Sequence, residues 1–243
     1  MRVAIHQPQY FPWPPYVHKV LSADIFVYLD SVQFSKNGVQ NRNQIKTAQG
    51  ALWLTIPVRN HLGQLLKDTR VAEPGATRKH WKTIKTSYAR TPGFARWQRE
   101  LETLLDRDTE SLLEAAIDST EWMLSKLDVR TERITASEID DIGGESSKLV
   151  ASICRALRAT SYLTGTGALA YLDERDFAEI GCEVMVQQWK PFTYDQVNGE
   201  FVPDLSTLDL LLNCPDEAAD LINAAGAWNT LRSRLQDSHD LQD

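Results

Sequence analysis

The sequence predicts an α/β protein with a largely parallel sheet and a helical insertion. Two strand–turn–helix–strand units support this class, one in residues 3–29 and one in residues 161–187, and a long helical segment lies between them. Two strands joined through a helix run parallel, and a parallel sheet carries helices on both faces. We therefore expect one Rossmann-like domain over residues 1–243.

The first unit opens with a short apolar strand at residues 3–5. Apolar side chains in the range 16–21 then recur at the spacing of one helix face. The run 25–29 follows as a second strand because it is rich in β-forming residues. Residues 52–56, again apolar and bounded by polar segments, are the next strand candidate.

Residues 77–127 are predicted to form the helical insertion. Apolar residues repeat at helix spacing from Phe94 to Leu105 and again from Leu113 to Leu127. Pro92-Gly93 separates the first of these helices from one that ends near Tyr88. Residues 129–134 return the chain to a strand.

A helix over 145–157, directly after a glycine pair, precedes the second unit. A strand at 161–164, a helix over 168–180 and a strand at 183–187 follow. Further on, Asp204 or Ser206 can cap the apolar helix that ends near Cys214, and this cysteine is interpreted as a buried apolar residue rather than a nucleophile. Residues 234–243 are expected to be frayed and polar.

Composition excludes several classes of protein. With 42% hydrophobic and 24% charged residues, the chain can form an ordinary globular core. No apolar run approaches the roughly 18 residues of a membrane helix, and the amino terminus lacks the apolar core of a signal peptide. We therefore expect a cytoplasmic protein with no membrane partner. The three widely spaced cysteines form no CxxC pair, so we expect no metal site.

The charge distribution points to a small anionic ligand. A net charge of −7 argues against general nucleic-acid binding. Residues 36–99 are nevertheless rich in Lys and Arg, which suits an anionic small molecule such as a nucleotide. The alternative for this segment is a solvated basic surface.

The stretch IHQPQYFPWPPYVHK at residues 5–19 is unusually rich in prolines and aromatics for a segment that follows a strand. Ligands of open α/β sheets bind outside the carboxyl ends of the strands, and His6, Gln7 and Gln9 fall there, with Tyr10 and His18 close in sequence. His6 is a candidate acid, base or donor to a phosphoryl or acyl oxygen. The alternative for His6 is a ring held by a backbone carbonyl at the strand end.

A second polar group follows the strand at 25–29, and its segment QNRNQIK at residues 40–46 is predicted to be a functional loop rather than a merely solvated one. Its amides can read a planar ligand, and its arginine can clamp a phosphate or carboxylate. The candidate site residues of this region are Asp30, Gln33, Lys36, Asn41, Arg42, Asn43 and Lys46.

The turn Thr164-Gly165-Thr166-Gly167 stands between a strand and a helix, where backbone N–H groups can hold an anion. Thr164, Gly165 and Gly167 are therefore candidate ligand residues, although a tight turn needs glycine in any case. The turn matches neither the dinucleotide fingerprint nor the P-loop. Motifs of metalloproteases, α/β-hydrolases and kinases are absent from the sequence.

Together these motifs resemble the WbqC-like protein family. The resemblance is carried by HQPQYFPW at 6–13, LDSVQF at 29–34, QNRNQIK at 40–46, SYLTGTG at 161–167 and GEFVP at 199–203, and it spans almost the whole chain. Pro15 stands where the family usually has glycine, and Ser31 stands where it usually has a second acid.

The resemblance implies an accessory enzyme of polysaccharide or specialised-metabolite biosynthesis, which transfers an acyl or aminoacyl group to an amine such as an amino sugar. A looser similarity is to nucleotidylyltransferases of the HIGH type, in which a histidine after the first strand stabilises the transferred phosphates. His6 and Lys19 lie roughly where that chemistry needs them, and His18 is the nearest candidate for the second histidine.

We therefore expect a transferase acting on a phosphate-bearing substrate, with His6, Lys36 and Arg42 as catalytic residues. Its small-molecule partner would be a nucleotide, a nucleotide-sugar or an amino acid derivative. Two alternatives stay open: a nucleotidyltransferase that uses ATP and Mg²⁺, and a non-catalytic nucleotide or sugar-nucleotide binding module. The residues expected to bind the substrate are Gln7, Tyr10, Lys19, Asp30, Gln33, Asn41, Asn43, Lys46, Thr164, Gly165 and Gly167.

Overall fold

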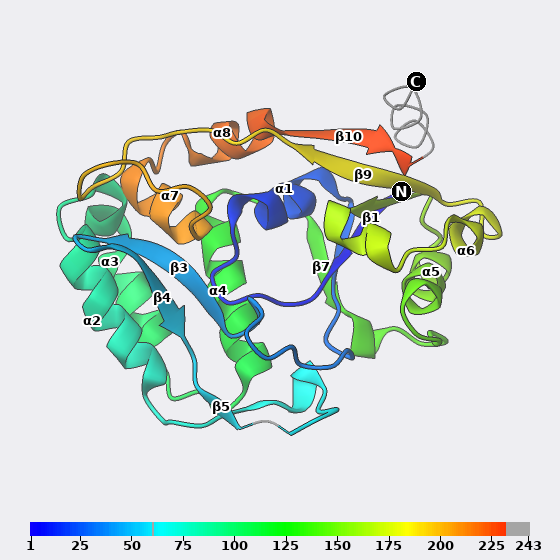
Figure 1. Cartoon of the computed structure of the whole chain (residues 1–243), viewed down its shortest axis with the longest axis horizontal. Helices are drawn as coiled ribbons and strands as arrows, with labels where there is room; N and C mark the ends of the chain where they lie inside the picture. Colours follow the sequence, from blue (N-terminus) through cyan, green and yellow to red (C-terminus); the bar gives the residue numbers. More distant parts are fainter. Residues whose placement is uncertain (60, 232–243) are drawn as a thin grey trace.

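A computed structural model describes residues 1–59 and 61–231. It has a mixed α/β architecture around a six-stranded sheet in the order β10-β9-β8-β1-β2-β7 (Figure 1). The strands are β1 (Arg2–His6), β2 (Ile25–Tyr28), β7 (Glu132–Thr135), β8 (Ser161–Thr164), β9 (Glu183–Trp189) and β10 (Gly226–Thr230). β10 pairs antiparallel with β9, and the other neighbours are parallel.

The strand order places β1 in the middle of the sheet. Numbered along the chain, the strands from β7 to β10 read 3-2-1-4-5-6, so the chain winds outward first to one side of β1 and then to the other. The strands expected near 3–5, 25–29, 129–134, 161–164 and 183–187 are all present. β10 was not expected, because GAWNT has little strand character by itself and pairs only where β9 offers its free edge.

Side chains alternate between two cores on the two faces of the sheet. Val3, Ile5 and Val27 pack on one face with residues of α5 (Ser147–Ala156) and α6 (Glu174–Ala178). Ala4 and Phe26 pack on the other face with residues of α1 (Pro14–Ser22) and α8 (Ala218–Ala225). Both faces of the parallel sheet are therefore covered.

Residues 29–131 leave the central sheet between β2 and β7. This segment contains β3 (Arg42–Thr47), β4 (Gly50–Thr55), β5 (Val58–Arg59), β6 (Arg70–Val71), α2 (Ala76–Tyr88), α3 (Pro92–Leu105) and α4 (Leu112–Lys126). The three helices lie where the apolar periodicity predicted them. α7 (Thr207–Asn213) contacts α3, α4 and β3, and the hydroxyl of Ser206, one of the two expected caps, accepts from the N–H of Leu208.

Three sequence expectations need correction. The strand expected at 52–56 is β4, but it pairs antiparallel with β3 in a separate hairpin rather than with the central sheet. Most of the loop expected at 40–46 is therefore the strand β3. The helix expected over 168–180 is split into a 3₁₀ turn (Thr166–Ala170) and α6, because Asp173 caps a new helix through a bond from the N–H of Arg175. The expectation for residues 234–243 falls outside the described residues.

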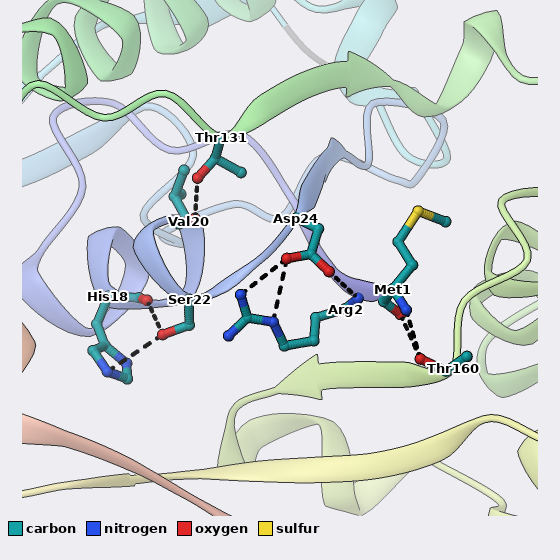
Figure 2. Close-up of polar contacts among 8 residues, drawn as sticks. All are labelled: Met1, Arg2, His18, Val20, Ser22, Asp24, Thr131 and Thr160. Atoms are coloured by element: carbon teal, nitrogen blue, oxygen red, sulfur yellow. Dashed lines mark hydrogen bonds and ion pairs between the residues drawn. The ribbon is translucent and has the colours of Figure 1, made fainter.

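The amino-terminal edge of the sheet is held by polar contacts (Figure 2). The Met1 ammonium donates to the Thr160 hydroxyl over 2.6 Å, and Arg2 forms an ion pair with Asp24 at 2.9 Å. Thr131 donates to the carbonyl of Val20 over 2.8 Å, which joins the start of β7 to α1. These bonds tie the amino-terminal ends of β1, β7 and β8 to neighbouring segments.

Candidate functional site

A cavity of about 580 Å³ lies at the carboxyl ends of β1, β8 and β9, beside α1. Its volume is within the range of small-molecule sites, roughly 300–1,000 Å³. It lies where the strand order reverses, between β1 and β8, and this is where open α/β sheets bind ligands. A second cavity of about 260 Å³, near Gly181 and Cys182, lies at the start of β9 and thus at the opposite edge.

His6 ends β1 and lines this cavity. Its Nδ1 lies 3.0 Å from the carbonyl oxygen of Gln7. Since a carbonyl only accepts, Nδ1 carries the proton and Nε2 keeps a free lone pair. Burial, followed by the nearby Lys19 charge, lowers the pKa of His6 to about 3. The alternative considered for His6, a ring held by a backbone carbonyl, is therefore present. The ring is neutral, and its Nε2 is left as a hydrogen-bond acceptor.

Lys19, in the last turn of α1, is the buried cation of the cavity. Lys19 is only 6% exposed. Its ammonium lies beside Gly165, so close that a Cβ added to this glycine would be 3.4 Å from Nζ. Burial lowers the pKa of Lys19 to about 7. Within the described residues it forms no ion pair and no side-chain hydrogen bond, and its ammonium lies 6.0 Å from the Tyr16 ring centroid. A buried charge without a counterion is costly, so an anionic ligand here would be strongly favoured.

Two glutamines of the cavity carry unpaired polar atoms. Gln9 is 3% exposed, and its Oε1 has no hydrogen-bond partner; the Nε2 of Gln188 is also buried and unpaired. Leaving such a group unsatisfied costs about 1–3 kcal/mol. A ligand that offers a donor to the first and an acceptor to the second would recover this energy.

Gln187 joins the cavity wall to α1. Its Nε2 lies 2.9 Å from the carbonyl of Pro15 and 2.8 Å from Nδ1 of His18. Pro15 lies in the first helical turn, where proline needs no N–H partner, so this departure from the family pattern fits the turn. His18 stacks on Trp228, with ring centroids 5.5 Å apart, and it does not line the cavity.

The structure brings together six of the expected site residues and separates the others from them. The residues that line the cavity are His6, Gln7, Lys19, Thr164, Gly165 and Gly167. The expected residues that do not line it are Tyr10, Asp30, Gln33, Lys36, Asn41, Arg42, Asn43 and Lys46.

Several of the excluded residues bind other parts of the chain. The buried Tyr10 hydroxyl lies 2.9 Å from Nδ1 of His80. Asp30 accepts from the N–H and the hydroxyl of Ser137, over 3.1 and 2.6 Å. Gln33 and Lys36 are exposed.

Asn41 and the polar residues of β3 contact other parts of the chain, which explains why the loop prediction failed there. Asn41 donates to the carbonyl of Ile56, and Asn43 donates to that of Phe11, over 2.8 and 2.9 Å. The Arg42 guanidinium lies 4.4 Å from the Trp53 ring centroid. These contacts lie within the fold, although Asn41 Oδ1 and Arg42 Nε are buried without a hydrogen-bond partner.

Asn43 helps to hold the proline-rich stretch in a strained shape. Phe11 has a φ of 45°, which is unfavourable for an aromatic residue. Its N–H donates to the Ser119 hydroxyl, and its carbonyl accepts from Asn43 and from the Ser206 hydroxyl. Such strain persists only where the surroundings determine the conformation, and here it lies between Gln9 and Trp13, which both line the cavity.

Sequence reasoning missed the aromatic and amide residues that complete the cavity. Trp13 and Tyr171 line it and are 38% and 49% exposed. Gln187, Gln188 and Trp189 end β9. The available signal was a run of polar residues at the carboxyl end of an otherwise apolar strand.

Residues 1–59 and 61–231 contain no group of three or more His, Cys, Asp or Glu side chains arranged to hold a metal ion. Within the same ranges, no helix is long and apolar enough to cross a membrane.

These features define the class: a mixed α/β protein with a largely parallel sheet and a ligand-sized cavity at its carboxyl edge. The chain belongs to the WbqC-like protein family, whose model matches residues 7–221, as the sequence motifs predicted. It is also 30% identical over 227 residues to "Uncharacterized protein Rv1507c" of Mycobacterium tuberculosis, an alignment that covers 91% of this chain and 97% of that relative. No solved structure is significantly similar to the chain.

Proposed function

We propose that this protein is a transferase that binds a phosphate-bearing activated substrate in the cavity between β1 and β8 and transfers its acyl or aminoacyl group to an amine. The observation that carries the proposal is Lys19, a buried ammonium without a carboxylate partner among the described residues, next to the neutral His6. The strand order supports a Rossmann-like reading of the sheet. The family resemblance supports a biosynthetic role in polysaccharide or specialised-metabolite pathways.

Each of the two residues has a distinct role in this proposal. Lys19 binds the negatively charged phosphate of the donor. This phosphate is the leaving group when the bond between it and the acyl carbon breaks. His6 accepts a proton at Nε2 from the amine as the new C–N bond forms. Because the pKa of His6 is about 3 in the empty cavity, this role requires the bound anion to raise that pKa.

Nucleotidyl transfer from ATP with Mg²⁺ is the second candidate, and the place of His6 at the end of β1 favours it. Two observations favour acyl transfer over it. No Asp or Glu is among the described residues that line the cavity, whereas Mg²⁺ sites normally include one or two carboxylates. His18, the nearest candidate for a second histidine, bonds to Gln187 instead.

A ligand screen by thermal shift tests the binding half of the proposal. Nucleotides, nucleotide-sugars and phosphorylated amino acid derivatives are the probes, and a ligand at 100 times its dissociation constant adds about 2.7 kcal/mol. Lys19→Gln should abolish the shift. Lys36→Gln is the matched control, since Lys36 is exposed and outside the cavity, and it should preserve the shift. Equal shifts in both variants would contradict an anion site at Lys19.

Turnover separates the three classes of function. His6→Ala should abolish amide formation while ligand affinity stays within about threefold, and His6→Gln tests whether an acceptor alone suffices. A His6→Ala variant with full turnover would remove His6 from the mechanism. Release of pyrophosphate from a nucleoside triphosphate would replace acyl transfer with nucleotidyl transfer. Tight binding with no turnover of any phosphate-bearing donor would leave a binding module.

A further inference from the structure

A narrow groove beside the cavity has a chemistry of its own. It is lined by four aromatic side chains of β9 and the segment after it, by Trp13 and by one acid. These residues, here called the aromatic groove, are Trp13, Trp189, Phe192, Tyr194, Phe201 and Asp204.

The aromatic groove adjoins the cavity. Trp13, Pro15 and Trp189 line both. A molecule in the groove therefore lies next to a molecule in the cavity, across the side chains of these shared residues.

The two spaces have opposite charge. Asp204 is the one charged residue among the described residues that line the groove, and no Lys, Arg or His lines it. The cavity has Lys19 and, among the described residues, no carboxylate. The cavity is therefore complementary to an anion, whereas the groove is complementary to a cation.

The aromatic rings reinforce this preference, because ring faces attract cations. Successive rings touch: Trp189 to Phe192 at 6.0 Å, Phe192 to Tyr194 at 6.0 Å, and Tyr194 to Phe201 at 5.4 Å between centroids. The groove holds about 40 Å³. This exceeds the roughly 10–15 Å³ that one water needs, so the groove admits an ammonium or methyl-sized group.

The segment that carries the groove is held in place before any ligand binds. The Tyr194 hydroxyl donates to Asp209 over 2.8 Å. Gln196 and Val202 exchange two hydrogen bonds of 3.0 and 2.8 Å, and the Lys46 ammonium donates to the carbonyl of Gly199 over 3.0 Å. A preformed site loses little conformational entropy on binding.

We propose that the aromatic groove binds an organic ammonium group, with Asp204 as its counterion and the rings of Trp189 and Phe192 as its walls. The inference rests on the proposed function in one respect: that this ammonium belongs to the amine that accepts the transferred group. The ammonium would lose one proton to solvent before attack, and His6 in the neighbouring cavity would accept the second at Nε2 as the C–N bond forms.

The test uses ethanolamine as the probe and ethylene glycol as a neutral control of the same size. Binding is followed by NMR through the indole N–H signals of Trp13 and Trp189, which Trp13→Phe and Trp189→Phe variants identify. Ethanolamine should shift both signals at neutral pH, and ethylene glycol should shift neither. Equal shifts with both probes, or none with ethanolamine, would overturn the proposal.

Two variants locate the effect. Asp204→Asn should weaken ethanolamine binding about three- to tenfold, and the change keeps the backbone because Asn adopts a φ of 58° as readily as Asp. Phe192→Leu keeps an apolar wall without a ring face and should weaken it about threefold or more. Unchanged affinity in both would remove the ammonium site.

Lys19→Gln makes this result independent of the proposed function. It should leave ethanolamine binding unchanged, whereas Asp204→Asn should leave the thermal shift with a phosphate-bearing ligand unchanged. If ethanolamine binds but no donor is turned over, the groove stands and the transferase proposal fails. If donors bind and react while ethanolamine does not bind, the groove fails alone.

Discussion

Lys19 makes the stability of the empty protein depend on pH in a predictable way. Its pKa is about 7 in the folded chain and 10.5 as the ordinary value. Between these values the unfolded chain binds more protons, so the free energy of unfolding rises with pH. The contribution of neutral Lys19 to the free energy of unfolding is fully present above about pH 10.5, and it is lost as the pH falls through 7.

The size of the effect follows from the shift. One fully linked proton changes the free energy of unfolding by about 1.4 kcal/mol per pH unit. Between pH 7.5 and 9 this residue should therefore contribute roughly 2 kcal/mol. Lys19→Met keeps an unbranched chain of similar length and removes the titrating group. The variant should be more stable than the wild type near pH 7 and should lose this dependence on pH.

Urea unfolding at pH 7.0, 7.5, 8.0, 8.5 and 9.0, followed by circular dichroism, measures the difference directly. Other titrating groups are common to both proteins, so they cancel when the two slopes are subtracted. Lys82→Met, at an exposed position of α2, is the control and should keep the wild-type slope. Parallel pH profiles for Lys19→Met and the wild type would refute the buried, uncompensated ammonium and with it the anion site.

Three further changes test the scaffold around the cavity by urea unfolding. Gly93→Ala should destabilise the fold by about 1–3 kcal/mol or more, because its Cβ would lie 2.3 Å from a backbone oxygen of α7. Gly143→Ala should change stability by under about 0.5 kcal/mol, because its Cβ would have no neighbour within 4 Å. Equal effects of the two changes would contradict the packing of α3 on α7. Asn43→Ala should cost about 1–3 kcal/mol, since it removes a bond to the strained Phe11; a neutral result would mean that the strain is held elsewhere. Asp209→Ala should cost about 3 kcal/mol or more, because it leaves two tyrosine hydroxyls without their acceptor; a loss below 1 kcal/mol would show that this network is not a structural support.

Much of the element pattern could be predicted from local sequence. The strands at β1, β2, β8 and β9 and the helices α1 to α5 follow from apolar periodicity, which reflects burial on one or two faces. Five of the cavity residues could be predicted because they end or follow β1 and β8, whose parallel pairing brings their carboxyl ends to one edge, and the sixth, Lys19, lies in the helix after β1.

The failures have a common cause in polar side chains. Asn41, Arg42, Asn43 and Lys46 have the residue types that read a ligand, and only the tertiary structure decides whether their partner is a ligand or a distant main chain. Here the partners are the carbonyls of Ile56, Phe11 and Gly199 for three of them, and an aromatic ring for Arg42.

The sequence by itself determined the α/β class, the family and His6 as the first residue of the candidate site, because these depend on local pattern and motif. The tertiary structure decided that Lys19 is the cation beside His6, since its lack of a counterion depends on everything packed around it. The tertiary structure also decided that β3 pairs with β4 in a separate hairpin outside the candidate site. It placed residues near 190–205 beside the cavity. Burial and pairing between distant segments are properties of the folded chain, and no short stretch of sequence contains them.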